Sequence, residues 1–165
     1  MLAGLNLSKK KLLKRGALCE TFVGDVSNYS TVNEMFDLAI SIYGKVNVLI
    51  NNAGIASIGL FQDMTPDMWN NIMSVNLNSV YNCCHFAVQD MLRRHCGKII
   101  NISSVWGLYG ASCEVAYSAT KGAINSFTKA LAKELAPSNI QVNAIACGAI
   151  DTEMNGHLSL RSFKN

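Results

Sequence analysis

Two hydrophobic periods alternate along the chain, one typical of buried strands and the other typical of amphipathic helices. Short runs rich in apolar and β-branched residues predict four strands, at positions 17–24, 46–50, 98–102 and 140–145. Between these runs the apolar residues are spaced three or four apart, which predicts helices over positions 7–15, 28–43, 65–94 and 115–136. Strands that alternate with helices in this way favour a parallel sheet with helices on both faces.

Residues at the ends of the predicted helices support this assignment. Gly16 and Gly44 each follow a helical segment, and glycine readily adopts the left-handed conformation in which helices end. Ser27 or Asn28 supplies a side-chain oxygen that can cap the second helix. Thr65 precedes a proline at the start of the third helix, a pairing typical of a helix N-terminus. The whole chain of 165 residues is expected to form a single α/β domain.

Composition and charge change this picture little. Half of the residues are hydrophobic, only two are proline, and no linker or internal repeat separates a second domain. The formal net charge is +3, and residues 1–16 contain five lysines or arginines and no acidic residue. This segment could contact a nucleic acid or a membrane surface, but a solvated helix face that ends at Gly16 explains it better. We therefore expect neither a nucleic-acid partner nor a membrane partner.

Targeting signals and metal-binding motifs are not evident in the sequence. The N-terminus has no continuous apolar segment typical of a secretory leader, and no run approaches the roughly 18 apolar residues of a transmembrane helix. The six cysteines include no C-x-x-C pair. Cys83, Cys84 and His85 are adjacent, so their side chains would point in different directions on a helix. These features predict a cytoplasmic protein with reduced thiols and no metal site.

The candidate chemistry lies between positions 103 and 122. Tyr117 and Lys121 are four residues apart on the last predicted helix, so both side chains lie on one face of it. A tyrosine pKa is ordinarily about 10, and lowering it to near 7 takes roughly 4 kcal/mol, which a nearby cation can supply. Ser104 lies near the carboxyl end of a predicted strand, where open α/β sheets bind their ligands. Taken alone, a Tyr-x-x-x-Lys pair is more often a surface packing pair.

The order and spacing of several polar residues are more specific than any one of them. The pattern consists of Asn51-Asn52-Ala53-Gly54, then Asn76, then Ser104, Tyr117 and Lys121. It resembles the short-chain dehydrogenase/reductase family, and in detail the branch that includes 3-oxoacyl-[acyl-carrier-protein] reductases. The resemblance covers about residues 17 to 154. It implies a Rossmann-like, doubly wound parallel sheet and an enzyme that reduces a carbonyl by hydride transfer, with a 3-oxoacyl thioester as the favoured substrate.

The resemblance also implies a role for each polar residue. Tyr117 would be the general acid in reduction and the general base in oxidation, while Ser104 would hydrogen-bond the substrate oxygen. Lys121 would bind the ribose of the cofactor and lower the pKa of Tyr117. Asn76 would hold a water that relays protons to Lys121, although it could also be a mid-helix asparagine with a local hydrogen bond. Ser103 is the alternative to Ser104, but only Ser104 precedes Tyr117 by the thirteen residues seen in the family.

The cofactor implied by the resemblance is NADP or NAD, with NADP preferred. Tyr117 and Lys121 match family positions that contact it, and so do several further residues. They are Asp25 and Val26 for the adenine, Asn52, Ala53 and Gly54 for the ribose, and Ile150 and Thr152 for the nicotinamide carboxamide. An aspartate that ends a strand and an Asn-Ala-Gly turn also occur where no ligand binds. The family usually has Pro-Gly ahead of the last two positions. Cys147-Gly148 stands there in this chain, which makes the loop less restricted.

The resemblance identifies parts of the family that this sequence does not contain. The family binds the cofactor pyrophosphate with a TG-x-x-x-G-x-G motif, and no such motif is present. The family sheet has the strand order 3-2-1-4-5-6 and then a seventh strand, and the resemblance implies that the first two strands and the seventh would be missing. The strand predicted at positions 17–24 would then slide against the next strand, stay detached, or border a gap that another chain fills. Such an open edge predicts poor solubility or misassembly of the chain alone.

Two functions are compatible with these observations. The first is an NAD(P)-dependent oxidoreductase built on one partial Rossmann-like domain, residues 1–165. The second is an inactive fragment, truncated at both ends, that acts as a subunit-interaction module. In the family, the helices that correspond to positions 66–94 and 115–136 pack against a second subunit, so the resemblance implies a homo-oligomer. The sequence does not separate NAD from NADP, or an acyl thioester from a sugar or steroid substrate.

Overall fold

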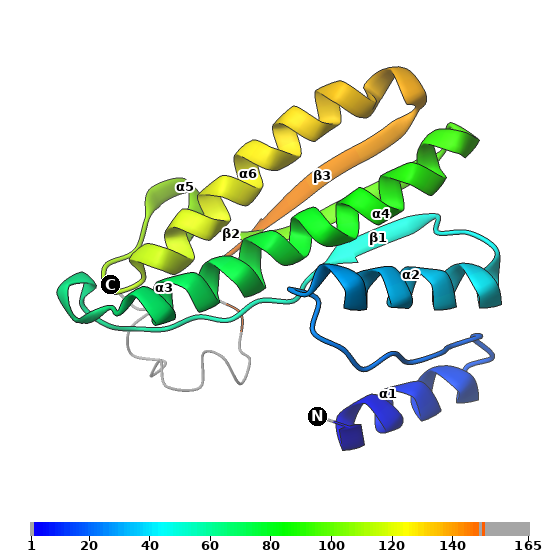
Figure 1. The fold of residues 1–165 in the computed structure, drawn as a ribbon, viewed down its shortest axis with the longest axis horizontal. Helices are drawn as coiled ribbons and strands as arrows, with labels where there is room; N and C mark the ends of the chain where they lie inside the picture. Colours follow the sequence, from blue (N-terminus) through cyan, green and yellow to red (C-terminus); the bar gives the residue numbers. More distant parts are fainter. Residues whose placement is uncertain (1, 149, 151–165) are drawn as a thin grey trace.

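Helices and strands alternate along the chain in the computed structural model, which describes residues 2–148 and 150 (Figure 1). The helices are α1 (Leu2–Lys14), α2 (Tyr29–Tyr43), α3 (Pro66–Met73), α4 (Ser79–Arg94), the single turn α5 (Trp106–Tyr109) and α6 (Val115–Leu135). The strands are β1 (Val48–Asn51), β2 (Gly97–Ser104) and β3 (Ile140–Cys147). Shorter elements are 3-10 turns at Phe61–Asp63 and Ala136–Ser138 and a π-helical turn at Ser74–Asn78.

The described strands form one parallel sheet in the order β1-β2-β3. Leu49 is level with Ile99, and Ile99 is level with Val142, so one row of side chains crosses the sheet. The next row contains Ile50 and Ile100, which point to the opposite face. Three of the four predicted strands and the parallel α/β class are therefore confirmed, and the described sheet is an incomplete version of the Rossmann-like one.

The strand predicted at residues 17–24 is wrong. This segment connects α1 with α2 and pairs with none of the described strands. An apolar run becomes a strand only where a neighbouring strand supplies partners for its N–H and C=O groups. The segment is instead tied to α1 by an ion pair between Lys9 and Glu20. Of the three alternatives, the described chain adopts the detached one, and α1 lies on the outside of the molecule beyond α2 (Figure 1).

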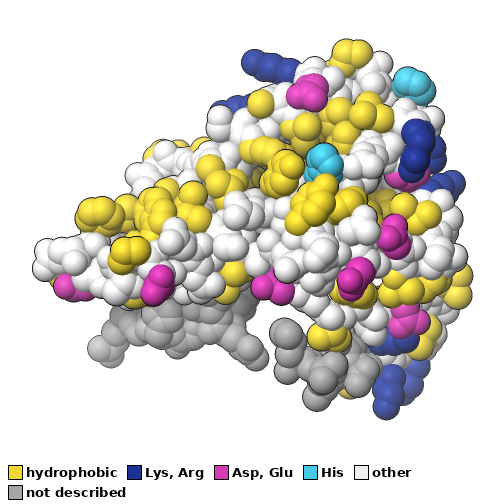
Figure 2. All heavy atoms as spheres, viewed as in Figure 1, with side chains coloured by type: hydrophobic (Ala, Val, Ile, Leu, Met, Phe, Trp, Pro, Cys, Tyr) yellow, Lys and Arg dark blue, Asp and Glu magenta, His cyan; other side chains and the backbone are white. Residues whose placement is uncertain are grey.

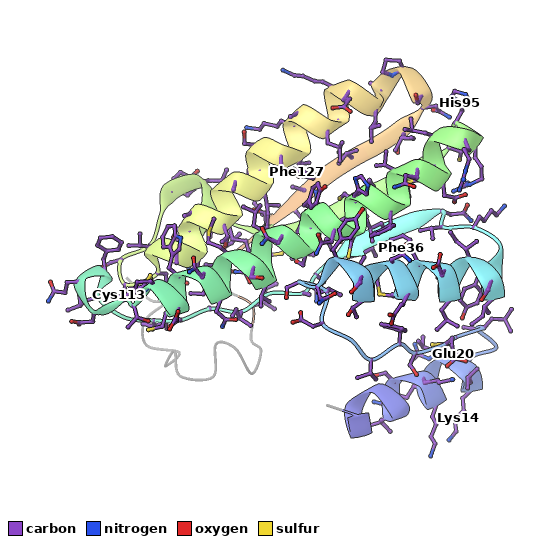
Figure 3. All side chains as sticks on the ribbon, viewed as in Figure 1. Lys14, Glu20, Phe36, His95, Cys113 and Phe127 are labelled. Atoms are coloured by element: carbon purple, nitrogen blue, oxygen red, sulfur yellow. The ribbon has the colours of Figure 1, made fainter. Side chains whose placement is uncertain are left out.

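Three long helices and one face of the sheet enclose the hydrophobic core. Both α4 and α6 pack on the sheet, and α2 packs against α4. Ile99 and Val142 from the sheet meet Ile124 from α6 in this core, and all three are at most 6% exposed. Phe36 from α2 and Phe127 from α6 extend the core on the two sides of α4 (Figure 3). The core therefore lies between the sheet and a single layer of helices.

The other face of the sheet has no helical cover in the part of the chain that the structure describes. Val48, Ile50 and Ile145 point to this face and are 48%, 59% and 50% exposed. Leu49 and Val142, in alternate positions, belong to the core or pack against it. The prediction of helices on both faces is therefore wrong for the described residues. Low solubility stays a prediction, which this exposed apolar surface favours.

Caps at the helix starts agree with the sequence, but the third predicted helix is not continuous. The Thr65 hydroxyl accepts a hydrogen bond from the Met68 N–H at 3.2 Å and caps α3. Asn28, rather than Ser27, caps α2 by accepting from the Thr31 N–H at 3.0 Å. The π-helical turn separates α3 from α4 and inserts one residue into the helical repeat. Asn76, in this turn, hydrogen-bonds with Ile55 in the loop that follows β1.

A polar cluster ties the end of α4 to the start of β1. Asp90, 8% exposed, accepts hydrogen bonds from the Val46 N–H at 3.2 Å and from the Arg94 guanidinium at 2.8 Å. Arg94 also donates to the Val46 carbonyl at 2.6 Å. Burial alone would raise the pKa of the Asp90 carboxyl, but the hydrogen bonds and charge of Arg94 outweigh it, and the pKa is lowered. This cluster fixes where β1 begins relative to α4.

Replacing Ile124 by alanine will destabilise the protein far more than replacing Ile145. Ile124 is 1% exposed, so its truncation leaves a cavity and costs about 2–5 kcal/mol of unfolding free energy. Ile145 is the matched control, because it is 50% exposed and its truncation costs about 1 kcal/mol or less. Urea unfolding followed by far-ultraviolet circular dichroism measures both values. Equal losses would contradict a core confined to one face of the sheet.

Candidate functional site

Polar residues from separate segments meet near the carboxyl ends of β1 and β2. Gly54 lies in the loop after β1, Asn76 lies in the π-helical turn, and Ser104 is the last residue of β2. Tyr117 and Lys121 lie in the first two turns of α6. Parallel strands bring their carboxyl ends to one edge of the sheet, which is where α/β folds bind ligands. The four residues predicted to be catalytic therefore lie in one region.

Lys121 is deeply buried for a lysine. It is 5% exposed, and its Nζ donates a hydrogen bond to the Ile102 carbonyl at 2.7 Å. The Nζ also lies 5.5 Å from the centroid of the Tyr117 ring. Burial lowers the pKa of Lys121, while the charge of Cys147 acts in the opposite direction. The described hydrogen bond uses one of the three N–H groups of the ammonium, which leaves donor capacity at the site.

The pKa of Tyr117 is shifted in the direction opposite to the one predicted. Burial of the phenol raises the pKa, a hydrogen bond with Ser104 acts against this, and the charges of Glu114 and Cys147 raise it further. The sequence pattern predicts instead that Lys121 lowers it. In the structure the ammonium is directed to the Ile102 carbonyl rather than to the phenol oxygen. In this arrangement Tyr117 keeps its proton.

The two adjacent serines at the end of β2 have different partners. The Ser103 hydroxyl, 3% exposed, donates to the main-chain carbonyl of Lys121 at 3.1 Å. The Ser104 hydroxyl oxygen accepts from the Trp106 N–H at 3.2 Å and also hydrogen-bonds with Tyr117. Adjacent residues of a strand point to opposite faces, which explains the difference. Ser104 is the serine that faces the phenol, as the spacing of thirteen residues predicts.

Asn76 binds protein groups through both ends of its amide. Its Oδ1 accepts from the Ile55 N–H at 2.8 Å, and its Nδ2 donates to the Ile55 carbonyl at 2.9 Å and to the Thr120 hydroxyl at 3.2 Å. The side chain is fully buried. A Cβ atom on Gly54 would lie 3.3 Å from Asn76 Oδ1 and 3.8 Å from Lys121 Nζ. These contacts support a structural role for Asn76, namely holding the loop after β1 beside Lys121.

The residues predicted to contact the cofactor ribose follow β1 directly. Asn52 and Ala53 are exposed, and Gly54 is partly buried at its contact with Asn76. Just before them, Asn51 donates to the Cys84 sulfur at 3.3 Å, which anchors the end of β1 on α4. The small side chains leave the backbone of this loop open to a ligand.

The predicted adenine contacts lie in the turn before α2. The Asp25 carboxylate is exposed and accepts from the Ser27 N–H at 2.9 Å, and this hydrogen bond lowers the pKa of Asp25. The Val26 carbonyl accepts from Asn82 of α4 at 3.1 Å. The turn is therefore anchored on α4, like the loop after β1. Of the predicted carboxamide contacts, Ile150 is exposed, and Thr152 lies outside the described residues.

Cys147 and Thr120 belong to the site although the sequence pattern assigns them no role there. Cys147 is level with Ser104 in the sheet, and its carbonyl accepts from the Val105 N–H at 2.9 Å. In its ionised form, the Cys147 thiolate raises the pKa of both Tyr117 and Lys121. The only signal in the sequence was the replacement of the usual Pro-Gly by Cys-Gly. Thr120 receives the hydrogen bond from Asn76, and its place directly before Lys121 carries no separate signal.

The described residues hold neither a metal-ligand cluster nor a membrane span. Within residues 2–148 and 150, no three His, Cys, Asp or Glu side chains are grouped so that they could hold a metal ion. None of the helices in this part of the chain is long and apolar enough to span a membrane.

Burial raises the pKa of Cys83 to about 11 and that of Cys84 to about 12, so both thiols stay protonated.

Comparison with known protein families decides where this arrangement belongs. A model described as short chain dehydrogenase matches residues 3–162. The chain belongs to the short chain dehydrogenase family. The family named from the polar motifs is thereby confirmed.

Individual relatives within the short chain dehydrogenase family agree with the branch named from the sequence. The chain is 37% identical to a 3-oxoacyl-[acyl-carrier-protein] reductase of Chlamydia muridarum, over 95% of the chain and 63% of the relative. It is 43% identical to an acetoacetyl-CoA reductase of Shinella zoogloeoides, over 79% of the chain and 54% of the relative. The crystal structure of an NAD+-bound xylitol dehydrogenase matches with a TM-score of 0.86 and 29% identity, over 90% of this chain and 57% of that one. The chain thus spans between about half and two thirds of these relatives.

Replacing Asn76 by alanine will destabilise the fold by about 2–3 kcal/mol, because it leaves the N–H and C=O of Ile55 without their partner. Asn71, an exposed asparagine of α3, is the matched control, and its replacement by alanine will change the unfolding free energy by about 0.5 kcal/mol or less. Thermal unfolding of the two variants measures the difference. A stability of Asn76→Ala equal to that of Asn71→Ala would show that the loop after β1 does not depend on this side chain.

Proposed function

We propose that the protein is a nicotinamide-dependent oxidoreductase that reduces a carbonyl compound, with 3-oxoacyl thioesters as the substrate class. The observation that carries this proposal is the grouping of the Ser104 hydroxyl, the Tyr117 phenol and the Lys121 ammonium at the carboxyl end of β2. Similarity to a 3-oxoacyl-[acyl-carrier-protein] reductase and to an acetoacetyl-CoA reductase supports the substrate class.

The residues around this group suit a nicotinamide cofactor. Lys121 retains N–H donors beyond the one given to the Ile102 carbonyl, and these could bind ribose hydroxyls. Asn52 and Ala53 are exposed and directly precede Gly54, which lies near Lys121, and Asp25 offers an exposed carboxylate for the adenosine end. When bound, the cofactor supplies the hydride. The similar xylitol dehydrogenase is an NAD+-bound structure, and the acyl reductase branch leads us to favour NADP over NAD for this chain.

Tyr117 and Ser104 have different roles at the substrate oxygen. The pKa of Tyr117 is raised, so the phenol is protonated at neutral pH and can donate a proton when a carbonyl is reduced. Ser104 hydrogen-bonds with the phenol and can donate to the same substrate oxygen, which stabilises the negative charge that develops there. Lys121 contributes positive charge 5.5 Å from the Tyr117 ring. Asn76 acts through its structural contacts with the loop that carries Gly54.

Replacing Tyr117 by phenylalanine will strongly lower turnover while retaining cofactor binding. The phenol oxygen supplies the proton, and the ring keeps its place beside Lys121, so calorimetric titration with NADPH and NADH will give similar dissociation constants for both proteins. Reduction of acetoacetyl-CoA followed by NADPH absorbance will fall by about a hundredfold or more in the variant. Undiminished turnover in the variant would remove Tyr117 from the mechanism.

The rate of carbonyl reduction will be nearly independent of pH across the neutral range. The donor is the protonated phenol, and burial raises its pKa above the ordinary tyrosine value of about 10, so the active form persists through neutral pH. The rate then falls only in the alkaline range as the phenol loses its proton. Initial rates across a buffer series measure the profile. A fall near neutral pH would mean that Lys121 lowers the pKa of Tyr117 in the complex, as the sequence pattern predicts.

A second candidate function is that of a subunit-interaction module without redox activity. The uncovered sheet face with Val48, Ile50 and Ile145 favours it, because apolar strands exposed on one face and at both edges invite a partner. Cofactor titration separates the two functions. Saturable binding of NADPH or NADH would support the oxidoreductase function. No binding at millimolar cofactor concentrations would support the subunit-interaction module instead.

An aromatic patch on the helical side, formed by Tyr29, Tyr81, His85 and Phe86, supports self-association through α4. Figure 2 shows hydrophobic side chains gathered around a histidine on this face of the molecule. Tyr29 is 45% exposed and Tyr81 is 51% exposed, so the patch is accessible in the single chain. We include in the proposal that the chain forms a homo-oligomer through the α3–α4 segment and α6.

A further inference from the structure

Two consecutive residues of β2 hydrogen-bond with Lys121, one with its side-chain ammonium and the other with its main chain. The Ile102 carbonyl accepts a hydrogen bond from the Lys121 ammonium at 2.7 Å. The Ser103 hydroxyl donates to the main-chain carbonyl of Lys121 at 3.1 Å. Both Ser103 and Lys121 are at most 5% exposed, so water cannot easily replace either partner.

The same part of α6 is held from a second side by the turn that follows β2. A Cβ atom on Gly107 would lie 2.5 Å from the Lys121 carbonyl carbon and 2.8 Å from the Gly122 nitrogen, so the backbones touch there. Asn125, one turn further along α6, donates to the Gly107 carbonyl at 3.2 Å. The backbone of α6 is therefore fixed at Lys121, and it is not merely packed through side chains.

We propose that Ser103 is a positioning residue that holds the Lys121 main chain against β2 and thereby keeps the Lys121 ammonium at the Ile102 carbonyl. The hydroxyl of Ser103 is not available to a substrate, because its proton is given to a carbonyl inside the protein. The serine pair is thus divided in function, with Ser103 acting on the lysine and Ser104 facing Tyr117. As far as Lys121 serves a cofactor, this inference rests on the proposed function.

The geometry explains why a hydroxyl is needed at this position. A lysine side chain has a flexible four-carbon stem, so an ammonium in a fixed place requires that the main chain be fixed as well. Loosening α6 at Lys121 would admit water around the ammonium. Burial now lowers the pKa of Lys121, so hydration would raise it towards the ordinary lysine value. Among the residues that the structure describes, the charged or titratable groups that act on this ammonium are Tyr117 on α6 and Cys147 on β3.

The test follows the titration of Lys121 itself in the full chain. Lysine labelled with carbon-13 at Cε gives one nuclear magnetic resonance signal per lysine, and Lys121→Met identifies the signal of interest. Ser103→Ala is expected to shift the Lys121 titration to higher pH, and Ser103→Thr, which keeps the hydroxyl, is expected to restore it. The measurement needs neither cofactor nor turnover, so it stays informative if the protein is not an oxidoreductase.

A matched control separates positioning from a general loss of stability. The Thr128 hydroxyl is also buried on α6, where it accepts from Asn101 at 2.9 Å and donates to the Ile124 carbonyl at 2.7 Å. Thr128→Val removes this hydroxyl two turns away from Lys121. We expect Thr128→Val to lower the melting temperature about as much as Ser103→Ala does while leaving the Lys121 titration unchanged.

Two results would overturn the proposal. The first is a Ser103→Ala protein in which Lys121 titrates as in the unaltered chain. The second is an equal shift in Thr128→Val, which would make the effect one of overall loosening. If the chain binds NADPH, the dissociation constant is also expected to rise about tenfold in Ser103→Ala, the equivalent of one hydrogen bond.

Discussion

The packing of α6 against β2 is the interaction on which the candidate site depends. Every group proposed to act on a substrate comes from one of these two elements, and their contact is polar as well as hydrophobic. Inside the core, Asn101 of β2 donates to the Thr128 hydroxyl at 2.9 Å and accepts from Asn51 of β1 at 2.8 Å. These bonds link two strands and the helix in one chain of buried polar groups.

The sequence predicted most of this fold because the information was local. Hydrophobic periods located the long helices and three strands, and Thr65 marked a helix start that the structure confirms. The prediction of a strand at residues 17–24 was wrong although their apolar pattern is that of a strand. A strand also needs a neighbouring strand to pair with, and the pattern of one segment does not reveal whether that neighbour is present. The π-helical turn was missed for a related reason. Asn76 in this turn hydrogen-bonds with Ile55 in a distant loop, and a local pattern does not reveal such a contact.

The candidate site was predictable as a set of residues but not as a set of interactions. Order and spacing were enough to select Ser104, Tyr117 and Lys121, and the structure places them together. Spacing could not reveal that the Lys121 ammonium turns to a backbone carbonyl. Nor could it reveal that burial of the phenol raises the pKa of Tyr117. Nor could it show that Ser103 binds the helix, because both serines look equivalent along the strand until the helix is packed against it.

The extra residue in the π-helical turn has a geometric consequence for the chain. An α-helix advances about 100° per residue, so one inserted position rotates α3 relative to α4 by roughly that angle. Consequently α4 can keep its apolar side on the sheet while the turn delivers an amide to the loop above it. Deleting one residue of the turn would restore a regular α-helix and move the Asn76 amide to another side of the helix axis. The π-helical turn thus sets the angle by which α3 is rotated relative to α4 about the helix axis.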